Sequence, residues 1–132
     1  MSGLRFRLAL LSAAGIIWAC STGLPPAQAH AIILESEPRH GDLVPAPKRL
    51  LLRFNSRIEK PLCLVQLVGG PRKRSVALMR QEADTAIDTL IYALPPLEPG
   101  PYQARWKVMA ADGHVTEGTV LFTVTGPAPA QK

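Results

Sequence analysis

The amino-acid sequence predicts an all-β fold, a Greek-key β-sandwich or barrel of seven strands. Short runs rich in β-branched and aromatic residues recur at nearly regular spacing, and Pro, Gly and Asp punctuate them. Helical periodicity is hard to find along the chain. Apolar and polar residues alternate in the last two runs, as they do when one face of a sheet is buried. Seven runs in about 100 residues match the size of immunoglobulin-like and cupredoxin-like sandwiches.

The seven expected strands follow one another between residues 31 and 125. Alternation is clearest in the sixth strand, where Tyr102 and Trp106 share one face and Arg105 lies on the other. Trp106 is therefore expected to anchor the core. Prolines gather in the connections, where a missing N–H removes no hydrogen bond of a sheet. The expected strands are Ala31–Ser36, Arg49–Asn55, Leu62–Val68, Ser75–Leu78, Thr89–Leu94, Gly100–Met109 and Gly118–Thr125.

Residues 1–29 have the pattern of a cleaved export signal. Two arginines precede an uncharged apolar run over residues 8–19, and the small-x-small triplet Ala27-Gln28-Ala29 stands before the expected cut. A retained membrane anchor is the weaker interpretation, because polar residues and two prolines interrupt the apolar run. Lipid attachment at Cys20 is also weaker, because Trp18 is a poor residue before such a site. The mature chain is thus expected outside the cytoplasm, beginning at His30.

Residues 30–125 are expected to form a single domain, followed by a flexible tail over residues 126–132. The mature chain carries 13 basic and 10 acidic residues, and its net charge of +3 is too mild for a nucleic-acid-binding surface. Cys63 is its only cysteine, which rules out an internal disulfide. The apolar neighbours of Cys63 predict a buried thiol.

Cleavage would make His30 the first residue, with a free α-amine beside its imidazole. A metal bound by the amine and by Nδ1 of the same residue closes a six-membered chelate ring. The amine has an ordinary pKa near 7.7, so a metal displaces its proton at neutral pH at little cost. Neutral imidazole is the commonest metal ligand in proteins, and a square arrangement of nitrogen and oxygen suits Cu(II). The competing interpretation is that leader peptidases tolerate many residues here, so that His30 stands after the cut by chance.

Asp112 and His114 form a second cluster, in the segment MAADGHVTEG. On an extended backbone, residues two apart point to the same face and reach one ion. The competing interpretation stays open, because Asp-Gly favours a tight hairpin turn that would simply reverse the chain. His30, its amine, Asp112 and His114 together supply three nitrogens and one oxygen, a set suited to Cu(II). His40 is left out as an exposed turn histidine, and Glu117 is a candidate partner behind His114.

Two motifs mark the ends of the mature chain. The start, HAIILESEPRHGDLVPAPKRLLLRFNSRIE, has an N-terminal His, then Ser-x-Pro-x-x-Gly, then a strand that ends in Phe and Asn. The end, GPYQARWKVMAADGHVTEGTVLFTV, has Gly-x-Tyr, Trp-x-Val, Asp-x-His, Gly and Phe-x-Val in that order. Both patterns resemble the CopC family of periplasmic copper-binding proteins. The resemblance spans residues 30–125 and is looser in the middle.

The resemblance implies a seven-stranded cupredoxin-like sandwich that binds one Cu(II) ion per chain in the periplasm. It implies His30, Asp112 and His114 as metal ligands, no catalytic residues, a role in copper homeostasis or resistance, and a CopD-type inner-membrane protein as a partner. We expect a monomer. Many members hold Cu(I) in a methionine-rich loop, which is missing here, because the mature chain has only Met79 and Met109.

Three other functions share parts of this pattern. Copper-dependent polysaccharide monooxygenases also use an N-terminal histidine chelate, but the mature chain is small, it has no aromatic-rich surface for a glycan, and Asp112 would fill the position that oxygen needs. A blue-copper site needs Cys, two His and usually Met in one short loop, and no histidine lies near Cys63 in the sequence. A metal-free interaction module, with the Asp-Gly turn and His30 both incidental, stays open.

Overall fold

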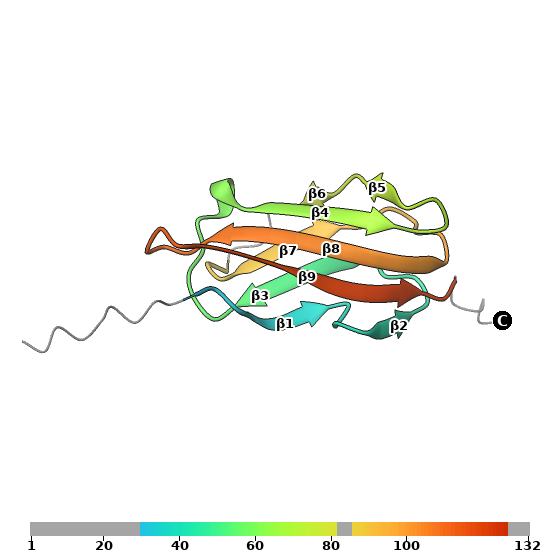
Figure 1. Ribbon diagram of the computed structural model, residues 1–132, viewed down its shortest axis with the longest axis horizontal. Coiled ribbons are helices and arrows are strands. Elements are labelled where there is room, and N and C mark those ends of the chain that lie inside the picture. Colours follow the sequence, from blue (N-terminus) through green and yellow to red (C-terminus); the bar gives the residue numbers. More distant parts are fainter. Residues whose placement is uncertain (1–29, 82–85, 127–132) are drawn as a thin grey trace, which may run out of the picture.

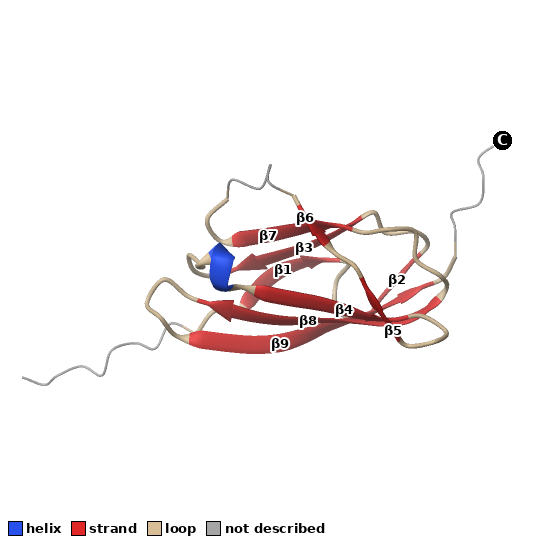
Figure 2. Cartoon of the chain, turned by 90° about the horizontal axis from the view of Figure 1, so that it is seen from above, coloured by secondary structure: helices blue, strands red, loops and turns tan. Residues whose placement is uncertain are grey.

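The computed structural model describes residues 30–81 and 86–126 of the chain. Nine β-strands in these residues form two sheets packed face to face, which confirms the predicted all-β sandwich (Figures 1 and 2). The expected export signal and nearly all of the expected tail lie outside the described residues. Within the described part, no helix has the length and apolar character needed to cross a membrane.

Each sheet has its own strand order. The four-stranded sheet is antiparallel with the order β1-β3-β7-β6, and the five-stranded sheet has the order β2-β9-β8-β4-β5 with β2 parallel to β9. A single turn of 3-10 helix, η1 (Lys60–Leu62), precedes β4. The strands are β1 (Ile33–Glu37), β2 (Asp42–Val44), β3 (Arg49–Phe54), β4 (Leu64–Gly69), β5 (Arg74–Val76), β6 (Met79–Arg80), β7 (Thr89–Ala93), β8 (Gly100–Met109) and β9 (Val115–Val124).

The core lies between the sheets and is filled by every second side chain of the long strands. Leu50, Leu52 and Phe54 of β3 are fully buried, and each such side chain contributes about 1.5–3 kcal/mol by leaving water. The ring of Phe54 meets Trp106 of β8 edge to face, with centroids 5.3 Å apart. Trp106 is thus the core anchor that the alternation predicts. Cys63 is a free, buried thiol, as predicted.

β8 has the predicted bounds, whereas β9 begins at Val115 and not at Gly118. Gly118 lies inside β9 opposite Trp106, and a Cβ atom there would come within 2.4 Å of Cζ2 of Trp106. A glycine within a strand often marks such a close approach. Gly118 therefore makes room for the indole and does not begin the strand.

The remaining differences are small and local. β4 begins at Leu64, two residues later than predicted, because Leu62 closes the 3-10 turn through its N–H to the Glu59 carbonyl. The other predicted strands agree with the structure to within two residues at each end. β2 and β6 were not predicted, since strands of three and two residues are too short to give a periodic pattern.

Candidate metal centre

The first described residues lie at one end of the sandwich, beside the loop between β8 and β9 (Figure 1). The N–H of Ala31 donates to Oγ1 of Thr116 at 3.2 Å, and the N–H of Ile32 donates to Oδ1 of Asn55 at 2.9 Å. The N–H of Asn55 donates in return to the Ile32 carbonyl at 3.0 Å. These bonds hold His30, which is exposed, next to the β8–β9 loop.

The β8–β9 loop is a compact turn over residues 110–114. The N–H of Ala110 donates to the His114 carbonyl, and the N–H of Gly113 donates to the Ala110 carbonyl, both at 2.9 Å. Gly113 has φ +87°, a left-handed conformation that glycine adopts without strain. The N–H of Ala111 also donates to the Arg57 carbonyl at 3.0 Å, which ties the loop to the segment after β3. Asp112 and Gly113 therefore do reverse the chain, as the turn interpretation predicts.

The same turn also brings Asp112 and His114 together. Oδ2 of Asp112 lies 3.0 Å from Nδ1 of His114, and Oδ1 of Asp112 accepts the backbone N–H of His114 at 3.0 Å. The backbone N–H of His114, and then its imidazole, lower the pKa of the Asp112 carboxyl below its ordinary value. When Nδ1 carries the proton of a neutral imidazole, Nε2 holds a lone pair and is available as a metal ligand.

His30 and His114 lie close enough to share one ion. Their ring centroids are 6.4 Å apart and the ring planes meet at 70°. A metal–nitrogen bond of about 2.0 Å puts an imidazole centroid about 3.1 Å from the ion, so the centroids of two imidazoles that share one ion lie at most about 6.2 Å apart. The observed separation of 6.4 Å is close to this upper limit, so the two rings lie within side-chain reach of one shared ion.

The side chains alone do not complete a metal site. Within residues 30–81 and 86–126, no three His, Cys, Asp or Glu side chains converge closely enough to hold an ion. Further donors would have to come from the main chain or from solvent. An α-amine on His30 would be such a donor if the chain were cut before this residue, because it would belong to the same residue as one of the two imidazoles.

The other residues considered from the sequence as ligands or partners make no hydrogen bond, ion pair or ring contact with His114 among the described residues. Glu117 is opposite Lys107 on the outer face of β9, and no hydrogen bond or ion pair joins it to His114 among the described residues. His40 accepts the Leu121 N–H through Nδ1 at 3.3 Å, in the turn between β1 and β2. Met79 and Met109 belong to different sheets.

Comparison with known proteins assigns the family. Residues 33–125 match the family model described as the CopC domain. The chain belongs to the CopC family. The matched residues include Asp112 and His114 but begin after His30. The family match therefore covers the β8–β9 loop of the candidate centre and not its N-terminal residue.

Individual proteins are also similar to this chain in sequence or in structure. Protein YobA of Escherichia coli K12 is 28% identical over 123 residues, which cover 92% of this chain and 94% of YobA. The crystal structure of CopC from Methylosinus trichosporium OB3b matches with a TM-score of 0.67 at 25% identity, over 77% of this chain and 100% of that chain. PcoC, a copper resistance protein from Escherichia coli, matches with a TM-score of 0.64 at 22% identity, over 71% of this chain and 99% of PcoC, which shows a common fold.

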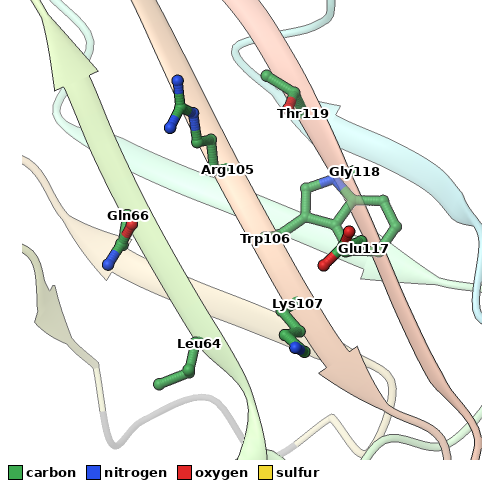
Figure 3. Close-up of a pocket in the computed structure, with 8 residues that line it drawn as sticks. All are labelled: Leu64, Gln66, Arg105, Trp106, Lys107, Glu117, Gly118 and Thr119. Carbon is green, nitrogen blue, oxygen red and sulfur yellow. The ribbon is translucent and has the colours of Figure 1, made fainter.

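This CopC chain also has a shallow groove away from the candidate centre. It has a volume of 480 Å³ and crosses the outer face of β4, β8 and β9, where Arg105 and Lys107 line it with Glu117 (Figure 3). Leu64 lies at its edge, and Gly118 and Trp106 form part of its floor. None of the predicted metal ligands lines this groove.

Two residues that hold the candidate centre were missed in the sequence. Thr116 could have been found, because it lies two residues after His114 and so shares its face of an extended strand. Asn55 could not, since its contact with Ile32 depends on how the segment after β3 pairs with the start of the chain. Asn55 belongs to the opening motif quoted above, but the motif does not indicate its contact with Ile32.

Proposed function

We propose that this CopC chain is a periplasmic Cu(II) carrier or buffer that acts in copper homeostasis or resistance. One ion binds to the amine and Nδ1 of His30, to Nε2 of His114 and to a carboxylate oxygen of Asp112. The chain performs no catalysis in this role. The ring separation of 6.4 Å between His30 and His114 is the observation that supports the proposal most directly.

The chemistry of the donors favours Cu(II) over other common ions. Three nitrogens and one carboxylate oxygen suit a tetragonal Cu(II) centre. A structural zinc site would call for a closed tetrahedral set that usually includes cysteine, and Cys63 is buried and donates its thiol hydrogen to the Glu59 carbonyl at 3.3 Å. Calcium would call for six to eight oxygen ligands, which this end of the sandwich does not gather.

Processing of the chain is part of the proposal. Residues 1–29 act as an export signal, cleavage before His30 creates the amine, residues 30–125 form the copper-binding domain, and residues 126–132 follow it as a tail. The full-length precursor lacks this amine and cannot form the chelate. Copper then passes from a monomeric chain to an inner-membrane protein of the CopD type.

The N-terminal amine provides the sharpest test. Two proteins are compared, one that starts at His30 and one with Gly-Ser added in front, and Cu(II) is titrated into each while the melting temperature is recorded. Binding to the folded state stabilises it by about 2.7 kcal/mol when free copper is 100 times the dissociation constant. We expect Cu(II) to raise the melting temperature of the protein that starts at His30, and to raise that of the extended protein only a little.

Electron spin resonance of the same samples identifies the donors. An axial Cu(II) spectrum with nitrogen hyperfine structure is expected for the protein that starts at His30, and an altered spectrum is expected after the extension. Equal affinity and equal spectra for both proteins would remove the amine from the site. Sustained product formation with a reductant and oxygen would show that the chain is an oxidative enzyme and not a carrier.

A further inference from the structure

We propose that Asn55 and Thr116 are positioning residues for copper, because they clamp the two residues that follow His30. The inference rests on the proposed copper site and concerns how the chain holds the amine and imidazole of residue 30 in place. Neither Asn55 nor Thr116 touches the ion in this arrangement. They act through the backbone of Ala31 and Ile32.

The clamp joins both sheets at one end of the sandwich. Asn55 follows directly after β3 in the four-stranded sheet, and it exchanges two hydrogen bonds with Ile32, at 2.9 Å through its side chain and at 3.0 Å through its backbone. Thr116 belongs to β9 in the five-stranded sheet, and its Oγ1 accepts the Ala31 N–H at 3.2 Å. The backbone of residues 31 and 32 is therefore fixed against both sheets at once.

The burial of Ala31 fixes the register of this segment. Its side chain is fully buried, while Ile32 beside it is 53% exposed. A slide of the chain by one residue would bring either an imidazole or an isoleucine into a space that holds a methyl group. Close-packed interiors do not accept such an increase in volume without strain. The clamp therefore selects one position for His30.

Thr116 also couples the two histidines to each other. It lies two residues after His114, so both side chains are on the same face of β9 and its extension. One short segment thus holds the ring of His114 and the N–H that follows His30. Once His30 is the first residue, its own ψ, χ1 and χ2 are the only rotations left between its donors and the clamp.

Three substitutions on β9 test the clamp. Thr116→Val keeps the shape of the side chain and removes the acceptor, Thr116→Ser keeps the acceptor, and Thr119→Val changes an exposed threonine on the outer face of the same strand. In protein that starts at His30, Thr116→Val should weaken Cu(II) binding about 3- to 10-fold, the effect of one lost hydrogen bond. Thr116→Ser should restore the affinity, and Thr119→Val should leave it unchanged. Competition with a chelator of known affinity measures all three.

Two readouts separate positioning from a general loss of stability. The electron spin resonance spectrum of Thr116→Val should broaden, because the donors of residue 30 take several arrangements around Cu(II). Asn55→Leu should weaken Cu(II) binding in the same way. Asn55→Asp keeps an oxygen acceptor for the Ile32 N–H, so it should retain most of the affinity for Cu(II). Hydrogen exchange of the Ala31 amide in metal-free protein should be faster in Thr116→Val than in Thr116→Ser.

The outcomes distinguish this inference from the proposed function. If the unmodified protein binds Cu(II) and Thr116→Val binds it with the same affinity and spectrum, the positioning role is overturned and the copper site stands. If the unmodified protein binds no Cu(II), the proposed function fails and copper positioning fails with it. Exchange of the Ala31 amide then still decides whether the clamp exists, since slow exchange that is lost in Thr116→Val needs no metal.

Discussion

Asp112 contacts His114 through both of its carboxylate oxygens, one at Nδ1 of the ring and one at the backbone N–H, each at 3.0 Å. This pairing reconciles the two interpretations of the Asp-Gly segment. The carboxylate stabilises a turn and, by the same two contacts, orients an imidazole so that Nε2 remains for another partner. A carboxylate behind a metal-bound histidine typically raises the basicity of the ligand and fixes its orientation.

Removal of the charge of Asp112 should therefore weaken copper binding. In Asp112→Asn the side chain keeps its shape and one acceptor, but it loses the negative charge that faces the ring. We expect Cu(II) affinity to fall about 10- to 100-fold, the usual effect of losing such a partner. Chelator competition at pH 7 measures the change.

Asp42→Asn is the matched control, because Oδ2 of Asp42 accepts the backbone N–H of Arg39 at 2.9 Å and no imidazole of the described residues contacts it. The control should bind Cu(II) as the unmodified protein does. Equal affinity for Asp112→Asn and Asp42→Asn would show that the contact with His114 has no part in copper binding.

The pKa of the Asp112 carboxyl should be below 3.8 in the metal-free protein. Because its folded-state pKa is lowered, the contribution of Asp112 to stability is present above its ordinary pKa and is lost as the pH falls through the lower folded-state value. The loosening of the turn is thus expected only below pH 3.8. Carbon-detected NMR titration of the carboxyl measures the pKa.

His114→Ala sharpens this titration. The backbone N–H of residue 114 is the largest cause of the lowered pKa and survives the substitution, whereas the ring is the second cause and is lost. The pKa of Asp112 should therefore rise only part of the way toward 3.8. A complete return would mean that the backbone contact contributes nothing.

Gly118→Ala should destabilise the protein by about 1–3 kcal/mol, because overpacking of a filled core has a cost in that range. The added Cβ would lie 2.4 Å from Cζ2 and 2.8 Å from Cε2 of Trp106, so the indole or β9 would have to shift. Urea unfolding monitored by tryptophan fluorescence measures the loss. Thr119→Ala, at the next residue and exposed, should change the free energy of unfolding by no more than about 0.5 kcal/mol. If both variants are equally stable, Trp106 does not pack over residue 118.

The thiol of Cys63 should react slowly in the folded protein. Burial is the main cause that raises its pKa, so the reactive thiolate is scarce at neutral pH. Labelling with a thiol reagent at pH 7 should be slow in buffer and fast in denaturant. Cys63→Ala should leave Cu(II) affinity within a factor of two, and a large loss of affinity would place a sulfur ligand in the copper site.

The sequence predicted the fold most accurately where a periodic pattern was long. The ten residues of β8 alternate without interruption, and both ends of that strand are as predicted. The start of β9 was wrong, because Gly118 has the local signature of a strand boundary and only its contact with Trp106 explains its position within the strand. β2 and β6 are defined by pairing with β9 and β7, which no short stretch of sequence encodes.

The sequence by itself determined the sandwich, the buried Trp106 and the chemistry available at His30, Asp112 and His114. These follow from residue types and from spacings of two along a strand, which are local properties of the chain. Tertiary structure alone decided that His30 lies beside His114. That proximity depends on contacts such as the bond from Ala31 to Thr116, whose residues are 85 positions apart, and on the register of two sheets. Local sequence patterns do not specify such long-range pairing, because it is set by the packing of the whole domain.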